Sequence, residues 1–449
     1  MVVAGVHIKE YTQFSPIDEL RHVDYAMRVT RFHMPRFGDL LSQESMREEA
    51  CRGVDIPIDE PACGTKQFDP RSFRDGGYQV ASAHPATYYL GAGWLARIAV
   101  ALGISNSFVD PARIFSALVT AAGLMVAFAA GRMAGLRAPP LLAALTLVLT
   151  MPAVLHASST VNPDSTAILA GAVVMLVGLA WERGRVPLWA LAIAGAFSTG
   201  TKFTSLLAVL VISGVFLVRA KPMTLVRARR AARAEAAPVP LMPGDPVVSA
   251  PGVEIPARAP FEYLKAAAVL LGSALLVAMV WAIFDRLRQV VDPAVIPQNQ
   301  LLASRGFPPL ASLFSPIDLY TWIPPWNSYD PVRFVTPYVL DVRVMMTYLF
   351  AGSTLMAALR VNRRDTMSLF GVFGVAASLL GAPAFILFTA ATANVLVNPE
   401  ARYGMSLIPF MAALLAAFVK GRFGVSLLWF FAAVSIVIVV GSMLVSTPV

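Results

Sequence analysis

The stretch MSLFGVFGVAASLLGAPAFILFTAAT, residues 367–392, carries no charged residue and decides the fold class. A second uncharged stretch, GVSLLWFFAAVSIVIVVGSMLVS, covers residues 424–446. Each is longer than the roughly 20 apolar residues that an α-helix needs to cross a bilayer. Both stretches therefore predict membrane-spanning helices, and we expect an all-α polytopic membrane protein.

The composition of the whole chain supports this fold class. Of its 449 residues, 57% are hydrophobic and only 14% are charged, whereas a soluble domain has about 25% charged residues. The net charge of +9 comes from basic residues beside apolar stretches, as the positive-inside rule expects. Because no soluble basic domain is predicted, the charge does not indicate nucleic-acid binding.

Apolar stretches predict about ten spans, after a polar and mixed region over 1–109. The predicted spans are 110–132, 138–157, 163–182, 186–200, 203–219, 264–284, 344–360, 367–392, 403–419 and 424–446. The stretch 86–104 is apolar but contains Trp94 and Arg97, which favours an interfacial helix. We therefore expect a five-helix block over 110–219 and a C-terminal block over 263–449.

Basic residues cluster in five of the predicted loops, and these loops give the orientation. The clusters are Arg132 and Arg137; Arg183 and Arg185; Arg219, Lys221, Arg227, Arg229, Arg230 and Arg233; Arg360, Arg363 and Arg364; and Lys420 and Arg422. Alternating spans place all five loops on one side, hence in the cytoplasm. Segment 220–262 is then a flexible basic cytoplasmic linker, and regions 1–109 and 285–343 are extracytoplasmic.

The N-terminal region raises a question of export. It is assigned to the outside, yet residues 1–16 contain neither a signal peptide nor a span. The sequence therefore predicts that a first membrane helix belongs upstream of this chain. The same region contains Cys51 and Cys63, whose spacing is not that of a zinc motif. An extracytoplasmic location favours a disulfide between them, and two free thiols are the alternative.

The first candidate site set is Asp18, Glu19, His22 and Asp24. Pro16 is expected to open a helix in which the two adjacent carboxylates occupy the first turn. Asp18 and His22 are four residues apart and share a face of that helix. A carboxylate there would act as a general base or bind a metal, and an ordinary capped surface helix is the alternative.

Two further sets lie at predicted outer helix starts. His84, Tyr88 and Tyr89 open the interfacial helix, where they are either membrane anchors or parts of a site. Asn162 and Asp164 flank a proline at the start of a span, where the asparagine suits the N-cap and the aspartate suits the helix dipole. Helix capping alone would explain that second set.

The remaining sets contain outer cations. Lys202 lies on the predicted outer side, where the positive-inside rule does not expect a basic residue. An ionisable residue near bilayer depth is a functional candidate. Its compact charge suits a phosphate, and a lysine that snorkels to the interface is the alternative. Arg402, followed by Tyr403, opposes the dipole of its helix and needs a partner. Either Glu400 or a bound phosphate would supply one.

These sets share one side of the membrane, and their order resembles a known family. Carboxylates with separated cations suit a lipid-linked phosphosugar and an acceptor hydroxyl that must be activated. The order of Asp18-Glu19-x-x-His22, His84, Asn162-x-Asp164, Lys202 and Glu400-x-Arg402-Tyr403 resembles the membrane glycosyltransferases of the GT-C clan. It looks closest to an uncharacterised bacterial branch with an Asp-Glu-x-x-His motif. The paired cysteines look like its actinobacterial members.

The resemblance implies a bundle of about eleven helices and a polyprenyl-phosphate-linked sugar donor. It implies that Asp18 or Glu19 is the catalytic carboxylate and that Arg402 contacts the donor phosphate. The sequence thus favours an inverting glycosyltransferase at the outer face of a bacterial cytoplasmic membrane, acting on a cell-envelope glycan or protein. The departure from the family is the first helix that normally precedes Asp18.

Two other functions remain open. A transporter or lipid flippase would place charges near the midplane and show internal repeats, and neither pattern is visible in the sequence. A non-catalytic membrane assembly subunit would retain these site residues but would not catalyse a reaction. A divalent cation bridging carboxylate and phosphate would fit the proposed chemistry, but no metal-ligand spacing in the sequence demands one.

Overall fold

A computed structural model describes most of the chain. The described residues are 2–54, 59, 61–220, 258–296, 301–303, 337–360, 362, 365–393, 396–397, 399 and 401–445. Most of the predicted linker over 220–262 and of the predicted loop over 285–343 lies outside this set, as does Glu400. Those predictions therefore stay predictions.

Helices that run side by side form the body of the molecule. They are α5 (Val109–Met133), α6 (Ala138–Val148), α7 (Pro152–Ser159), α8 (Ala167–Glu182), α9 (Leu188–Thr201), α10 (Leu206–Ala220), α12 (Pro260–Arg288), α14 (Pro337–Leu359), α15 (Thr366–Ala393), α16 (Ile408–Phe418) and α17 (Gly421–Val445). Short 3-10 helices and two strands join them: η4 (Pro163–Thr166), η5 (Phe203–Ser205), η6 (Pro293–Val295), η7 (Ala401–Leu407) and the antiparallel pair β1 (Leu301–Ala303) and β2 (Leu396–Val397).

Within the described residues, six helical segments are long and apolar enough to cross a membrane. A seventh span results if α6 and α7, which meet at a 71° bend, count as one. Pro152 begins α7 at this bend, and its missing N–H cannot continue the ladder of α6. Three shorter apolar helices bring no further confirmed span. An all-α multi-pass membrane protein is thus supported, while the count of ten spans stays a prediction.

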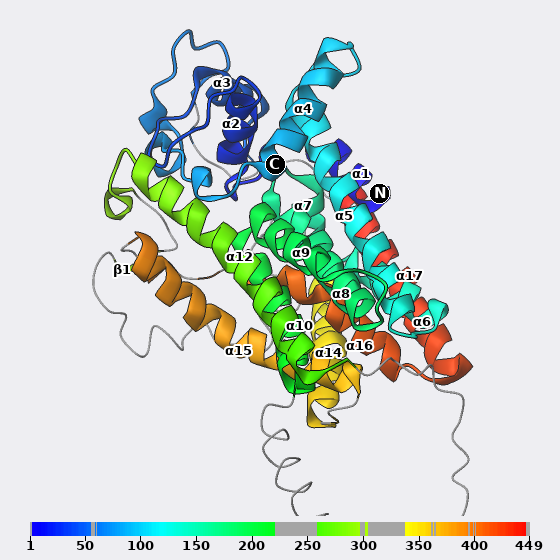
Figure 1. The fold of residues 1–449 in the computed structure, drawn as a ribbon. Helices are drawn as coiled ribbons and strands as arrows, with labels where there is room; N and C mark the ends of the chain where they lie inside the picture. The colour runs from blue at the N-terminus through cyan, green and yellow to red at the C-terminus, as the bar shows by residue number, and fades with distance from the viewer. Residues whose placement is uncertain are drawn as a thin grey trace, which may run out of the picture.

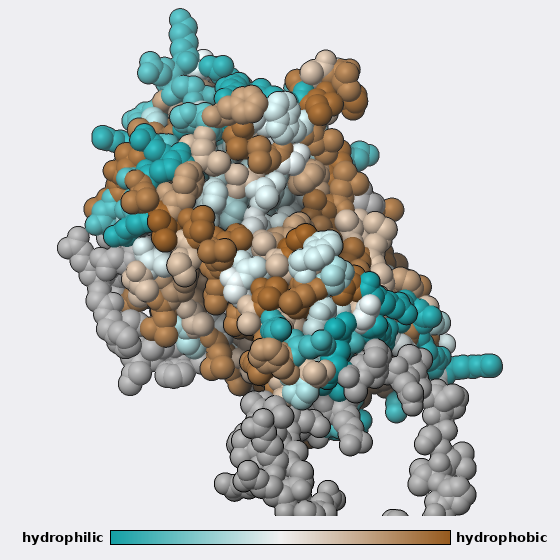
Figure 2. Space-filling model, in the orientation of Figure 1, coloured by the Kyte–Doolittle hydropathy of each residue, from teal (hydrophilic) through white to brown (hydrophobic). Residues whose placement is uncertain are grey.

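The surface of the bundle matches this assignment. Figure 2 shows a brown apolar zone across the middle of the visible face, with teal polar residues gathered at both ends. Inside, small residues allow the helices to pack closely. At Gly171, α8 lies so near η7 that a side chain would collide with the carbonyl of Ser406. This close approach brings the segments before α8 and before α16 together.

The N-terminal region packs at one end of the bundle (Figure 1). It contains α1 (Val2–Glu10), α2 (Glu19–Val29), α3 (Gln43–Arg52), η1 (Pro70–Ser72), η2 (Arg74–Gly77), η3 (Ala81–Ala83) and α4 (Thr87–Ala101). We call the end that carries α2, α3 and α4 the outer end, and the opposite end the inner end.

Two sequence predictions for the N-terminal region can be compared with the structure. The predicted interfacial stretch 86–104 is helical as α4, and it exposes Trp94 and Ile98. Cys51, in the last turn of α3, forms the predicted disulfide with Cys63. The bond closes the loop that follows α3.

Candidate functional site

Four sequence-distant segments meet at the outer end of the bundle. They are the start of α2, the segment before α4, the α9–η5 connection at Lys202, and η7. Through them the structure gathers Asp18, His22, His84, Lys202 and Tyr403 around one cavity. The sets predicted from sequence therefore converge, although they lie hundreds of residues apart.

Asp18 is the N-cap residue of α2 and has an unusual backbone conformation. The helix begins at Glu19 and not at Pro16, because residues 16–18 form a turn. Asp18 has φ 58° and ψ 2°, a left-handed conformation that is uncommon for residues other than glycine. Such strain persists only where surrounding contacts over-determine it, and it is frequent at functional sites.

The Asp18 carboxylate is held between two arginines. Arg21 Nη1 lies 2.6 Å from Asp18 Oδ1, and Arg402 Nη2 lies 3.7 Å from Oδ2. Burial opposes ionisation of the carboxyl, but the positive charges of Arg21 and Arg402 outweigh it and lower the pKa of Asp18 to about 2. The side chain nevertheless stays 35% exposed. Asp18 is thus an ionised, accessible carboxylate at neutral pH.

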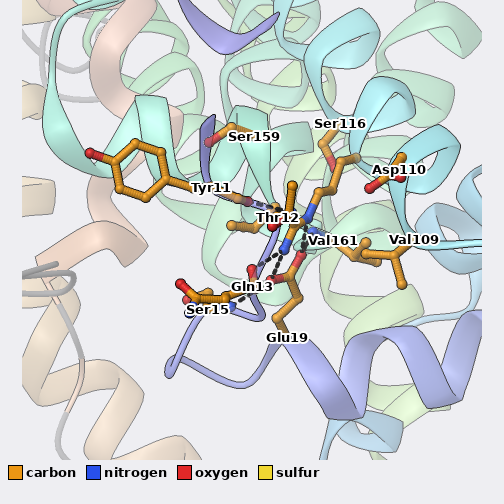
Figure 3. A network of polar contacts seen from close by, with 12 residues as sticks. Tyr11, Thr12, Gln13, Ser15, Glu19, Val109, Asp110, Ser116, Ser159 and Val161 are labelled. Carbon is orange, nitrogen blue, oxygen red and sulfur yellow. Dashed lines mark hydrogen bonds and ion pairs between the residues drawn. The ribbon is translucent and has the colours of Figure 1, made fainter. Parts of the chain in front are cut away.

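Glu19 has a different environment from its neighbour, as Figure 3 shows. Its Oε1 accepts from Arg113 Nε at 2.8 Å and from the backbone N–H of Val161 at 2.9 Å. Its Oε2 accepts from Arg113 Nη2 at 2.8 Å and from the backbone N–H of Ser15 at 2.7 Å. A carboxylate has about four acceptor positions, so these bonds saturate it. The geometry therefore favours a structural role for Glu19, and of the two adjacent carboxylates only Asp18 lines the cavity.

Arg113 extends this structural network into the N-terminal segment. Its Nη1 donates to the carbonyl of Tyr11 at 2.8 Å, and its Nη2 donates to the carbonyl of Gln13 at 2.6 Å. The guanidinium and the Glu19 carboxylate are each 1% exposed. Together they fix the segment that enters α2 against α5.

A second buried ion cluster lies beside Asp18. Asp164 pairs with Lys202 and accepts from Arg402 Nε at 3.1 Å. Asn162 caps η4 as predicted, because its side chain accepts from the backbone N–H of Asp164 at 2.9 Å. Lys202 Nζ also lies 4.7 Å from the centre of the Tyr403 ring, a cation–π distance. The cluster joins η4, the α9–η5 connection and η7.

Two histidines lie on the cavity side of α2 and before α4. His22 Nδ1 is 2.9 Å from the hydroxyl of Tyr89, and its ring centre is 6.0 Å from that of His84. Burial, with the nearby charge of Lys202, lowers the pKa of His84 to about 3. Burial and the neighbouring His84 lower the pKa of His22 well below its ordinary value. Both rings are therefore neutral at physiological pH.

Tyr88, Tyr89 and Asp24 were also predicted as site residues, but they lie behind the cavity wall. The Tyr88 hydroxyl is 2.7 Å from that of Ser116, and Tyr89 stacks on Tyr25 with ring centres 3.9 Å apart. The Asp24 carboxylate accepts hydrogen bonds from Ser42, Ser45 and Gln79 and forms an ion pair with Arg28. A substrate-binding role for Asp24 has no support from this geometry, because its carboxylate is fully buried and already bonded.

The cavity itself has a volume of about 210 Å³. Its polar residues from the N-terminal region and the bundle are Asp18, Arg21, His22, His84, Lys202, Thr204, Asp285, Arg286, Gln289, Thr389, Thr392 and Tyr403. The rest of its wall is largely apolar, with Phe385 and Phe388 of α15 and Phe203 of η5. An amphiphilic ligand with a charged head would match such a mixed wall.

Sequence reasoning missed several residues of the cavity wall and of the network that supports it. Arg113 lies inside the predicted span 110–132, and a charge at that depth signals a buried partner. Arg21 is three residues from Asp18, a spacing that places both on one helix face. Asp285 and Arg286 lie at the end of a predicted span, where charged residues are common, so no sequence signal distinguishes them.

Metal binding and similarity to known proteins add little to the assignment. Among the described residues, no group of three or more His, Cys, Asp and Glu side chains is arranged to hold a metal ion. No protein-family model matches the chain, and no curated protein has a significantly similar sequence. The function must therefore be argued from the site.

Proposed function

We propose that this protein is a membrane glycosyltransferase that moves a sugar from a polyprenyl-phosphate donor to an acceptor at the extracytoplasmic face. The observation that carries the proposal is the convergence of Asp18, Asp164, Lys202 and Arg402 beside one mostly apolar cavity. Buried charges without a structural need are expensive. Their concentration around an accessible space favours a ligand that uses them.

The charge balance of the cavity wall favours an anionic head group. Three cations, Arg21, Lys202 and Arg286, line the cavity together with two carboxylates, Asp18 and Asp285. The neutral histidines add no charge. A phosphate beside Lys202 would gain charge-assisted hydrogen bonds, and the apolar wall would accept the first part of a polyprenyl chain.

Asp18 is the base in this proposal. The acceptor hydroxyl oxygen attacks the anomeric carbon of the donor, the bond from that carbon to the phosphate oxygen breaks, and the hydroxyl proton passes to Asp18. A carboxylate with a low pKa is a weak base, so it takes the proton late, when the attacking oxygen has become acidic. Lys202 and Arg402 stabilise the negative charge that develops on the departing phosphate.

The test is sugar transfer by Asp18→Asn protein in membranes supplied with labelled polyprenyl-phospho-sugars. Asn keeps the shape but takes no proton at neutral pH, so the rate should fall about 10²- to 10⁴-fold, while donor binding changes little. Lys202→Ala should lower both donor affinity and rate. Asp69→Asn, on the exposed cap of η1, is the matched control and should transfer normally.

The same assay separates the rival functions. Near-normal transfer by Asp18→Asn protein would remove Asp18 as the base. If the wild-type protein moves the intact lipid across the membrane without breaking the sugar–phosphate bond, the transporter function is correct. Donor binding without either activity would favour an assembly subunit.

A further inference from the structure

The last turns of α12 present a polar stripe to the cavity. Ala282, Asp285 and Arg286 of α12 line the cavity, together with the C-cap residue Gln289. Their spacing of three, four and seven residues places them on one face of the helix. The neighbouring Met279, Ile283 and Leu287 are instead exposed at 57%, 53% and 81%. One side of this helix end thus faces lipid and the other faces the proposed substrate.

Asp285 is chemically distinct from the rest of the wall. Among the described lining residues, the only other carboxylate is Asp18, which two arginines contact. Asp285 has one nearby arginine, Arg288, and the Ser82 hydroxyl as protein partners, which leaves acceptor positions on its carboxylate for a ligand. A carboxylate repels a phosphate but accepts hydrogen bonds from hydroxyl groups. A ligand group beside Asp285 should therefore be rich in hydroxyls and uncharged.

The two neighbouring side chains of the stripe complement this preference. Gln289 Nε2 donates to the carbonyl of Val291 at 2.8 Å, which fixes the amide. Arg286 is exposed at the cavity and offers donors only. Acceptors and donors on successive helix positions match a polyol, whose hydroxyls both donate and accept.

We propose that the outer end of α12 is a carbohydrate subsite in which Asp285 accepts hydrogen bonds from hydroxyls of the donor's sugar. The inference rests on the proposed glycosyltransferase function and deepens it. It assigns sugar recognition to α12, whereas phosphate recognition belongs to Lys202 and Arg402. The sugar and the phosphate of the donor are then recognised by different elements. Variants of Asp285 and of Lys202 should therefore affect binding of the two groups separately.

The experiment compares two classes of lipid on purified protein in lipid nanodiscs. One is a bare polyprenyl monophosphate, and the other is the same lipid carrying glucose, mannose, galactose or arabinose. Asp285→Asn should lower affinity for the preferred sugar lipid about tenfold, the effect of one charge-assisted hydrogen bond. Its affinity for the bare lipid should stay within about twofold. Lys202→Ala should lower the affinity for both lipids.

Controls and a second variant keep the result decisive. Asp292→Asn makes the same chemical change on an exposed residue outside the cavity and should bind both lipids normally. Asp285→Glu keeps the charge but moves the carboxylate by one methylene, so it should change which sugar is preferred. It serves as the test if the Asn variant does not fold, as judged by its thermal unfolding midpoint.

Three outcomes would overturn the proposal. If Asp285→Asn lowers the affinity for both lipids equally, this residue has a structural or phosphate-linked role. Unchanged affinity and unchanged sugar preference in both Asp285 variants would remove it from recognition. Wild-type protein that binds none of the sugar lipids contradicts the glycosyltransferase function as well, whereas the first two outcomes, found where the wild-type protein does bind a sugar lipid, contradict the subsite alone.

Discussion

The adjacent residues Asp18 and Glu19 belong to two buried charge clusters with different properties. The Glu19–Arg113 cluster is closed, because every acceptor position of the carboxylate is bonded to this chain. The cluster of Asp18, Arg402, Asp164 and Lys202 adjoins the cavity, and Asp18 keeps 35% of its side chain exposed against 1% for Glu19.

Charge and burial alone therefore do not identify a functional residue. What separates the two carboxylates is spare hydrogen-bonding capacity together with access to a cavity. On this basis the first cluster should determine stability and the second should determine ligand binding and turnover. Variants of each cluster would test that separation.

The largest expected effect on stability is the loss of Arg113. Arg113→Met keeps much of the side-chain volume but leaves the buried Glu19 charge without its partner, which should cost about 3–5 kcal/mol of unfolding free energy. Thermal unfolding in detergent would measure it, with Asp18→Asn as the matched comparison. If Arg113→Met leaves the unfolding midpoint unchanged, the closed cluster is not structural.

Loss of the disulfide should have a smaller effect. The bond between Cys51 and Cys63 closes a loop of 12 residues' separation, and chain-entropy reasoning gives it about 3 kcal/mol. The double Cys51→Ser, Cys63→Ser variant should therefore unfold at a lower temperature but retain donor affinity, since neither sulfur lines the cavity. A variant with normal stability but impaired binding would contradict the separation of the two roles.

The smallest effect concerns acid pH and the histidines of the cavity. The pKa of His84 is about 3 in the folded protein, against an ordinary value of 6.5. Because the unfolded chain binds the proton first, stability should fall as pH drops below about 6.5 towards 3. Unfolding midpoints of wild-type and His84→Asn protein from pH 7 to 5 would show this, and the variant should have the flatter profile. Parallel profiles would mean that His84 is accessible to protons in the folded state.

Much of the fold was predictable, because apolar stretches are a strong signal. The stretch 367–392 lies within α15, and residues 424–445 of the second stretch lie within α17. The 71° break between α6 and α7 was not predicted, although Pro152 lies at it. Proline signals a possible break, but only packing decides whether the helix bends or ends there.

The sequence singled out several of the charged residues that the structure brings together, but not their contacts. Asp164, Lys202 and Arg402 were singled out separately, because each was a charge beside an apolar span. Their mutual pairing depends on tertiary packing, which no local pattern encodes. Glu19 differs from Asp18 because it pairs with Arg113, which lies 94 residues further along the chain. The spacing of residues in the sequence does not reveal such a pair.

The long separations within the open cluster have a consequence for biogenesis. Asp164 and Lys202 are 38 residues apart, so they can pair while the chain is still being inserted, whereas Arg402 reaches Asp164 across 238 residues. Because synthesis proceeds from the N-terminus, the site stays incomplete until the segment before α16 has been translated. A ribosome-stalled chain that ends before residue 400 would therefore lack the arginine that pairs with both Asp18 and Asp164, so the charge cluster beside the cavity is completed only in the final stage of synthesis.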